Sequence, residues 1–343
     1  MPPFFRRLPR HLLLAAFALA PALSMAAGCA GLKSGGYVVL NPLDSDPSWR
    51  VNLLDVNADT LVVTDRAGSV QLSATADKCR YTTPEGTQLM VSRRGVLFVR
   101  GGDAVGQPFW GVGMPVQALT LKQIAGTWNV AQQETTDTTS YSTNAVATVN
   151  AKGAFAWGGC DARGANCVDP SRRGTLTPNA EGGFDLKFNK SEGGGLQRFF
   201  GLRLTDGSRL LLGVGIDHRM LVVMTAQQPL SLPTVGEREG RWESGHSGLS
   251  SFGTVTASTY EVVGVDPVAG SYQRKRLENC RVDALSVNDG HVGVAFRAAG
   301  TYVDCTDGVT RSFANTLFMP AGSLGFGTFT AAPGSMGMYI VRP

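Results

Sequence analysis

The chain has few charged residues and no stretch with the pattern of an amphipathic helix. Asp, Glu, Lys and Arg together make up 17% of its 343 residues. Beyond residue 28, no window holds an apolar period of 3.6 residues over three turns. No apolar run there approaches the roughly 20 residues that a membrane-spanning helix needs. The sequence therefore predicts neither a helical bundle nor a transmembrane span.

A strong charge of either sign is also missing. Three of the 31 basic residues precede residue 28, where there is no acidic residue, so the remainder has a formal charge of 28 − 27 = +1. A nucleic-acid-binding surface needs a clear excess of Lys and Arg. Nucleic acid is therefore not among the predicted partners.

The first 28 residues have the order of a secretory signal sequence. Arg6, Arg7 and Arg10 precede an apolar run from Leu12 to about Leu23, and small residues follow up to Gly28. We expect residues 1–28 to be removed on export. The mature protein is then predicted to be periplasmic or anchored to the outer membrane, with secretion as an alternative.

The string Ala26-Ala27-Gly28-Cys29 resembles the lipobox of bacterial lipoproteins, in which the cysteine is lipidated and becomes the N-terminus. The resemblance implies a lipid anchor on Cys29. It departs from the family pattern at Ala26, where a lipobox usually has Leu, so cleavage after Ser24-Met25-Ala26 is the alternative. Membrane anchoring is expected only if Cys29 is lipidated.

The composition and the short apolar runs predict an all-β fold. The chain has 43 Gly and 17 Pro, which suit many short strands joined by turns. Runs rich in Val, Thr, Leu and Phe recur between Gly, Asp and Asn, for example Gln88–Ser92, Phe184–Phe188 and Leu210–Val214. We expect tandem antiparallel β units, each a small barrel or a sandwich, with almost no helix beyond the signal sequence.

A set of landmarks recurs three times in one order, which indicates internal repeats. Each set has a Trp, a Gly turn leading to a Cys, an acid-Gly turn and a Gly-apolar-Gly strand. The Trp residues, for which we expect a structural role, are Trp49, Trp128 and Trp242, and the closing strands contain Gly111-Val112-Gly113, Gly213-Val214-Gly215 and Gly325-Phe326-Gly327. The predicted units are residues 29–120, which are short and atypical, 121–232 and 233–343.

Two of these tryptophans carry a further resemblance. Gly126-Thr127-Trp128 and Gly240-Arg241-Trp242 resemble the Gly-x-Trp opening of lipocalin-like barrels, where the Trp closes one barrel end. The resemblance covers three residues in each unit. It implies an apolar interior cavity for a small apolar ligand, with Trp128 and Trp242 at equivalent ends. The alternative is an ordinary buried Trp at the start of a strand.

The six cysteines of an exported chain predict a disulfide framework. Pairing of nearest neighbours would join Cys160 to Cys167 and Cys280 to Cys305. Cys79 then pairs with Cys29, unless Cys29 is lipidated and Cys79 has no partner. No Cys-x-x-Cys string or Cys/His pair at ligand spacing occurs, so no metal site is predicted.

No motif predicts catalytic residues or a cofactor. Gly245-His246-Ser247-Gly248-Leu249 is the nearest string to a nucleophile elbow, but it lacks the final Gly and a following helix. His218 is expected in a hairpin turn, and His291 in solvent at the start of a strand. The densest basic cluster, Arg274-Lys275-Arg276, is expected at a solvated strand edge or turn, where it would oppose aggregation.

These observations favour an exported cell-envelope protein that is a non-enzymatic binding or interaction module. Its partner would be an unknown envelope or extracellular component or a small apolar ligand. One alternative is an exported hydrolase with a site between units. Another is a structural or adhesin-like surface component, with flat unit surfaces and exposed strand edges.

Overall fold

The computed structural model describes residues 29–42, 44, 46–102, 108–136, 139–161, 165–168, 170, 172–189, 195–247, 255–322, 324–329 and 335–342. The predicted signal sequence lies outside these residues. Within them the only helices are η1 (Pro47–Trp49) and α1 (Leu121–Ile124), and all other elements are strands. This confirms the all-β prediction. Neither helix of the described ranges has the length and hydrophobicity to cross a membrane.

The first unit is an open antiparallel sheet, which we call the first sheet. Its strand order is β4-β3-β2-β1-β9-β8-β7-β6-β5. The strands are β1 (Gly35–Leu40), β2 (Val51–Asn57), β3 (Val62–Asp65), β4 (Gly68–Gln71), β5 (Ser73–Ala74), β6 (Arg80–Thr82), β7 (Gln88–Val91), β8 (Leu97–Gly102) and β9 (Pro108–Pro115). Hairpin turns with glycines at positive φ, such as Gly68 and Gly86, allow consecutive strands to pair.

The second unit is a closed barrel, which we call the first barrel. Each strand pairs with the next, and β10 pairs with β17 to close the ring, with Trp128 opposite Ala226. The strands are β10 (Gly126–Thr135), β11 (Ser140–Val149), β12 (Ala154–Gly159), β13 (Arg172–Pro178), β14 (Phe184–Phe188), β15 (Gln197–Arg203), β16 (Arg209–Gly215) and β17 (Arg219–Ala226).

The third unit is the second barrel, closed by pairing of β18 with β27. Its strands are β18 (Arg238–Ser247), β19 (Thr256–Asp266), β20 (Ser271–Arg276), β21 (Val282–Val287), β22 (Ala295–Arg297), β25 (Thr316–Ala321), β26 (Leu324–Phe329) and β27 (Ser335–Val341). Between β22 and β25 the chain forms a separate two-stranded arm, β23 (Gly300–Val303) and β24 (Thr310–Phe313).

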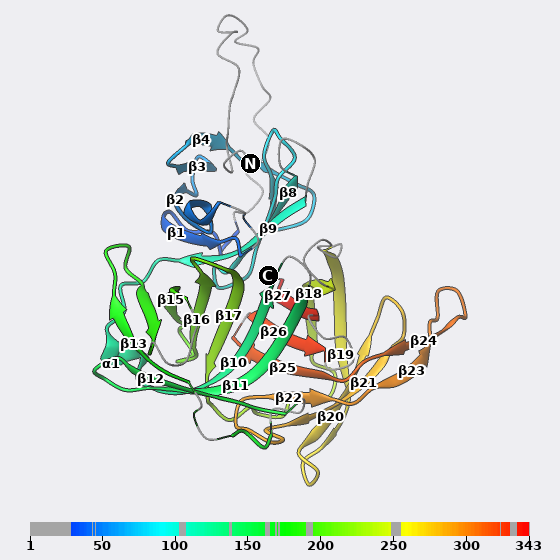
Figure 1. Cartoon of the computed structure of the whole chain (residues 1–343). Helices are drawn as coiled ribbons and strands as arrows, with labels where there is room; N and C mark the ends of the chain where they lie inside the picture. Colours follow the sequence, from blue (N-terminus) through cyan, green and yellow to red (C-terminus); the bar gives the residue numbers. More distant parts are fainter. Residues whose placement is uncertain are drawn as a thin grey trace, which may run out of the picture.

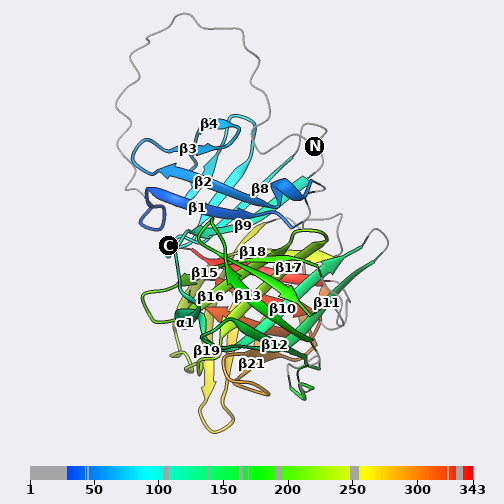
Figure 2. The ribbon, with the colours of Figure 1, turned by 60° about the vertical axis from the view of Figure 1, so that its left-hand side comes forward.

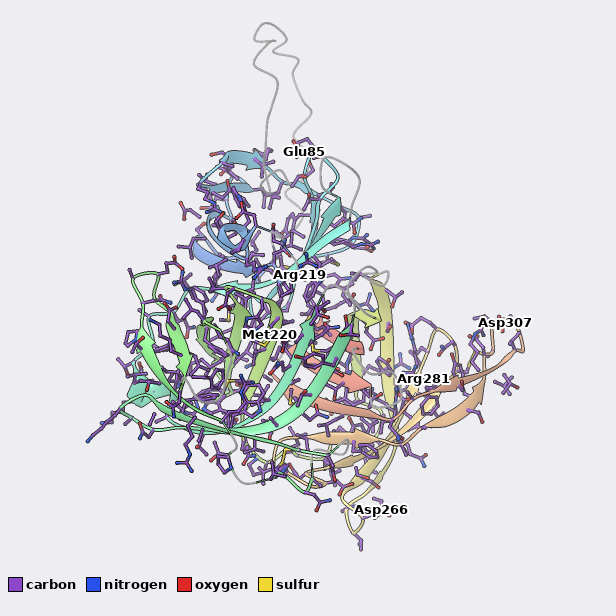
Figure 3. All side chains as sticks on the ribbon, viewed as in Figure 1. Glu85, Arg219, Met220, Asp266, Arg281 and Asp307 are labelled. Carbon is purple, nitrogen blue, oxygen red and sulfur yellow. A yellow bond between two sulfur atoms is a disulfide. The ribbon has the colours of Figure 1, made fainter. Side chains whose placement is uncertain are left out.

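The two barrels lie side by side, with the first sheet across one end of the pair (Figures 1 and 2). The arm extends away from the second barrel, with Asp307 at its tip, as Figure 3 shows. Polar contacts join the units. Arg50 of the first sheet donates to the carbonyl oxygens of Gly215 and Ile216 at 3.3 and 3.0 Å, and Thr328 of the second barrel donates to Asn144 of the first at 2.8 Å.

Packing in the first barrel explains its nearly continuous apolar strands. In β15 and β16, neighbouring side chains point to opposite faces. Phe199 and Leu211 lie inside the barrel, in a core with Trp128 and Phe184, whereas Phe200 packs outside in a cluster that also includes side chains of the first sheet and the second barrel. Both faces of these strands are therefore buried, and the barrel interior is filled by side chains.

The Gly-x-Trp strings do not occupy equivalent places, contrary to what the lipocalin-like resemblance implies. Trp128 lies inside the first barrel and donates from Nε1 to the carbonyl oxygen of Ile124 at 3.1 Å. Trp242 packs in the cluster between the units, because the residues on either side of it point into the second barrel. Trp49 lies in η1 with the Arg66 guanidinium 3.4 Å from its ring centroid.

All six cysteines are paired in the structure. The bonds are Cys29–Cys79, Cys160–Cys167 and Cys280–Cys305. The Cys29–Cys79 bond has a consequence for anchoring, because a sulfur in a disulfide cannot also form a lipid thioether. In the structure, the sulfur of Cys29 forms the disulfide with Cys79.

Candidate functional site

Charged side chains alternate along the strands of the second barrel and point to its interior. On β18, Glu239, Arg241 and Glu243 occupy every second position, and Trp242 between them faces outward. Arg274 and Arg276 occupy alternate positions on β20. Asp283 on β21 and Arg297 on β22 are further charged residues of this interior. Because side chains in a strand alternate with period two, this pattern gives the second barrel a charged interior.

A cavity of about 220 Å³ opens into this interior. Residues of seven strands line it, among them Glu243, Tyr260, Arg274, Arg297, Phe318 and Tyr339, and Arg281 lines it from just before β21. Glycines provide the space. A Cβ at Gly325 would overlap the ring of Tyr339, and one at Gly327 would lie 2.9 Å from Cγ2 of Thr316. Larger residues at these positions would displace the wall of the cavity.

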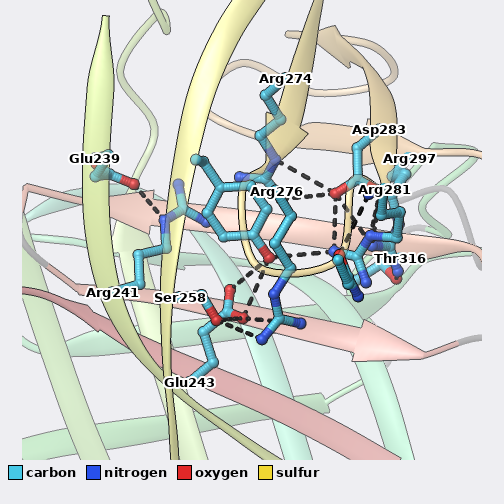
Figure 4. Close-up of polar contacts among 12 residues, drawn as sticks. Glu239, Arg241, Glu243, Ser258, Arg274, Arg276, Arg281, Asp283, Arg297 and Thr316 are labelled. Carbon is cyan, nitrogen blue, oxygen red and sulfur yellow. Dashed lines mark hydrogen bonds and ion pairs between the residues drawn. The ribbon is translucent and has the colours of Figure 1, made fainter. Parts of the chain in front are cut away.

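Asp283 lies behind the cavity wall, fully buried, and faces three guanidinium groups (Figure 4). Its carboxylate oxygens are 2.8 Å from Nε of Arg281, 3.3 Å from Nη1 of Arg297 and 3.4 Å from Nε of Arg274. Burial alone would raise the pKa of Asp283, but the three arginines outweigh it and hold the pKa below its ordinary value. The carboxylate is therefore ionised.

Glu243 is the second carboxylate of the interior. It accepts hydrogen bonds from Oγ of Ser258 at 2.8 Å and from the hydroxyl of Tyr260 at 2.9 Å, and Nη1 of Arg276 lies 3.8 Å away. Burial raises its pKa, while Arg241 and Arg276 lower it, and the net pKa is below the ordinary value. Glu243 is ionised as well.

Aromatic rings hold the arginines in place. The guanidinium of Arg241, which also pairs with Glu239, lies 3.8 Å from the ring centroid of Tyr339, and that of Arg274 lies 4.3 Å from the centroid of Tyr260. Burial raises the pKa of Tyr339 to about 12. Tyr339 is neutral at physiological pH and adds no negative charge.

Positive charge is therefore in excess inside the second barrel. The five arginines are Arg241, Arg274, Arg276, Arg281 and Arg297, and the four carboxylates that they contact are Glu239, Glu243, Glu278 and Asp283, so the sum is 5 − 4 = +1. Within the described residues, Nη1 of Arg241 and Nε of Arg297 are buried without a hydrogen-bond acceptor. A buried charged donor without an acceptor is costly, so the interior can stabilise an anion.

The expectation for the Arg274-Lys275-Arg276 cluster was wrong. Arg274 is 3% exposed and lies inside the second barrel rather than at a solvated edge. The alternation of charged residues on β18 and β20 was visible in the sequence, but charged residues usually face water, and nothing local shows that these face inward. The lipocalin-like resemblance implies an apolar cavity, whereas the cavity of the second barrel is lined in part by charged side chains, and apolar side chains pack inside the first barrel.

The histidines that the sequence singled out lie apart from this cavity. Nδ1 of His218 is 2.6 Å from Oδ1 of Asp217, in the turn before β17. His291 contacts the Cys160–Cys167 disulfide at the boundary between the barrels. His246 is on β18, and its side chain lies outside the described part of the structure. The described residues therefore bring no histidine to the carboxylates of the second barrel.

No protein-family model and no curated protein sequence matches this chain. Solved structures with some likeness are transferrin-binding proteins B. A mutant from Haemophilus parasuis Hp5 has 8% identity and a TM-score of 0.29 over 85% of this chain, which spans 64% of that protein's length. A second, from Neisseria meningitidis serogroup B, has 6% identity and a TM-score of 0.28, with 90% of this chain and 77% of that chain covered.

Proposed function

We propose that the protein is an exported, non-enzymatic binding protein and that the cavity of the second barrel takes a small anionic ligand. The observation that carries this is the excess of positive charge, +1, among the paired arginines and carboxylates of the second barrel. Asp283 and Glu243 neutralise part of the arginine charge, and the remainder is available to a ligand.

The cavity chemistry indicates a carboxylate or phosphate group on the ligand. Guanidinium groups bind both anions through two parallel hydrogen bonds, and the aromatic stacking of Arg241 and Arg274 fixes the planes of these groups beforehand. A volume of about 220 Å³ accommodates one such group with a small body. Phe318 and Tyr339 offer ring surfaces for that body.

Export is supported by the cysteines as well as by the predicted signal. All six form disulfides, which persist in oxidising compartments outside the cytosol. We propose a periplasmic or outer-membrane-anchored location, with secretion as the alternative. The intact mass of the mature protein decides whether a lipid on Cys29 replaces the Cys29–Cys79 bond, because a diacyl adduct would leave one free thiol at Cys79.

The test replaces Arg274 by Met, which keeps an unbranched side chain between Tyr260 and Phe318 and removes the charge. We expect inorganic phosphate or citrate to raise the melting temperature of the native protein at constant ionic strength. Arg274→Met should weaken that binding at least about tenfold, because a charge-assisted hydrogen bond contributes roughly 1.5–3 kcal/mol. Isothermal titration calorimetry measures the affinity.

The matched control is Arg238→Met, on the same barrel, where the side chain is 65% exposed and pairs with Glu261. It should bind anions as the native protein does. Equal loss in both variants would indicate nonspecific attraction and contradict the proposal. Absence of binding by a broad panel of carboxylates and phosphates would favour the structural alternative.

A further inference from the structure

A cysteine pair of the first barrel and a histidine of the second barrel meet at one point. Cys160 and Cys167 lie in the connection between β12 and β13, and His291 lies in the connection between β21 and β22. Nε2 of His291 is 2.7 Å from Sγ of Cys167 and 4.0 Å from Sγ of Cys160. All three side chains are half-buried, and their ligand atoms lie within 4.8 Å of one another. Two sulfurs and an imidazole are a ligand set that zinc prefers.

The histidine is positioned by contacts with the first barrel and with the connector that follows it. Nδ2 of Asn129 donates to the carbonyl oxygen of Val292, the next residue after His291, at 2.8 Å. The Asn288 side chain forms two hydrogen bonds with the backbone of Leu230, at 2.9 and 3.0 Å. The loop that carries His291 is thus held on both sides, so the imidazole does not depend on the sulfur atoms for its position.

The cysteine loop is closed by hydrogen bonds as well as by the disulfide. The backbone N–H of Val168 donates to the carbonyl oxygen of Gly159 at 2.9 Å, and that of Asp161 donates to Ala165 at 3.0 Å. The Asp161 carboxylate accepts from the N–H of Ala165 at 2.9 Å. None of these bonds involves a sulfur atom, so their donors and acceptors are the same whether the disulfide is closed or open.

We infer that Cys160, Cys167 and His291 form a zinc site that is closed by oxidation and opened by reduction. A dithiol reductant transfers two electrons to the disulfide, becomes a disulfide itself and leaves two thiols on the protein. Zinc then binds the two thiolates and Nε2 of His291, with loss of the two thiol protons, and water takes the fourth position. In the oxidised protein both sulfur atoms are bonded to each other and cannot serve as thiolate ligands.

The sequence predicted no metal site, and the reason is the distance along the chain. Cys160 and Cys167 are seven residues apart, and His291 follows Cys167 by 124 residues on another barrel. Only the docking of the two barrels brings the three groups together. The inference is independent of the anion cavity, because no side chain is shared between the two sites.

The experiment measures metal binding to the mature protein before and after reduction, with Zn²⁺ in competition with a chromophoric chelator. We expect no high-affinity zinc in the oxidised protein and one zinc per chain after reduction. Replacement of zinc by Co²⁺ should give thiolate-to-cobalt charge-transfer absorption. His291→Ala should weaken zinc binding at least about tenfold, the loss that even an outer-shell partner commonly causes. His218→Ala is the control and should leave the affinity unchanged.

A second variant separates this site from the other cysteines, since reduction also opens the Cys29–Cys79 and Cys280–Cys305 bonds. The reduced Cys160→Ser/Cys167→Ser protein should bind no zinc. Zinc binding that survives in this variant would place the metal on the other four thiols and overturn the inference. So would a reduced native protein that keeps its far-ultraviolet circular dichroism and binds no zinc.

Discussion

Asp283 holds together the charges of the second barrel, since three arginines share its carboxylate. Transfer of each guanidinium out of water is costly, and attraction to a buried carboxylate compensates for that cost only with close geometry. Burial lowers the pKa of Arg297, and the nearby Arg281 and Arg274 lower it further, whereas Asp283 opposes the shift. Loss of this one charge would leave three neighbouring cations to repel one another.

We therefore predict that Asp283→Asn lowers the free energy of unfolding by about 3–5 kcal/mol at neutral pH, as expected when one partner of a buried ion pair is removed. Urea unfolding followed by circular dichroism measures the change. Asp59→Asn, at an exposed turn, is the matched control and should change stability by less than about 0.5 kcal/mol. A similar small change in both variants would contradict the central role of Asp283.

The pH dependence of the same variant gives a second measurement. The pKa of Asp283 is lowered in the folded protein, so its carboxylate stabilises the fold above its unfolded pKa, about 3.9. That stabilisation is lost as pH falls through the lower folded pKa. The difference in stability between native protein and Asp283→Asn should be constant near neutral pH and should shrink in acid below about pH 4.

At the scale of the elements, glycines of the Gly-apolar-Gly strands lie where a neighbouring side chain occupies the space that a Cβ atom would need. Gly213 on β16 faces the ring of Phe199 on β15, and a Cβ there would overlap that ring. The ring packs among the buried side chains of the first barrel, and protein cores are close-packed. This glycine therefore sets the packing of the first barrel rather than a turn.

Gly213→Ala should lower the free energy of unfolding by about 1–3 kcal/mol through overpacking. Gly159→Ala is the matched control, because it lies on a strand of the same barrel and a Cβ there would meet nothing within 4 Å. Chemical denaturation of both variants measures the difference. A Gly213→Ala protein as stable as Gly159→Ala would show that the Phe199 ring moves freely.

The strands could be predicted from the sequence, but the closure of these strands into barrels could not. The apolar run Leu210–Val214 correctly predicts β16 (Arg209–Gly215). Barrel and sandwich remained open alternatives, because the pairing of β10 with β17 joins residues nearly 100 positions apart and leaves no local pattern. For the cavity, the alternation of charges on β18 is local, but the choice of the inner face depends on carboxylates and rings from other strands.

At the scale of the whole molecule, Arg50 connects the first sheet to the first barrel. Its side chain is 4% exposed, and Nη1 donates to the carbonyl oxygens of Gly215 and Ile216. Burial lowers the pKa of Arg50, and repulsion from Arg219 adds to this, whereas Asp44 and Asp217 oppose the shift. Apolar packing in the same region continues from the first sheet to both barrels.

Arg50→Met should loosen the first sheet from the barrels and cost about 2–3 kcal/mol, the contribution of hydrogen bonds from a charged donor. Differential scanning calorimetry should show a lower melting temperature or a separate early transition, with faster proteolysis confined to the first sheet. Arg80→Met is the control, since Arg80 pairs with Asp77 at the surface. Unchanged melting in both variants would mean that the apolar contacts alone hold the sheet.

The cavity of the second barrel is complete only after β18 has paired with β27; we call this pairing the seam. Neighbouring strands can pair as hairpins early, but Trp242 and Ile340 meet across 340 − 242 = 98 residues. Until that seam forms, the arginines remain hydrated and compete poorly for an anion. If the second barrel binds an anion as proposed, a partly completed chain would not sequester it, and anion binding would mark molecules whose assembly is finished.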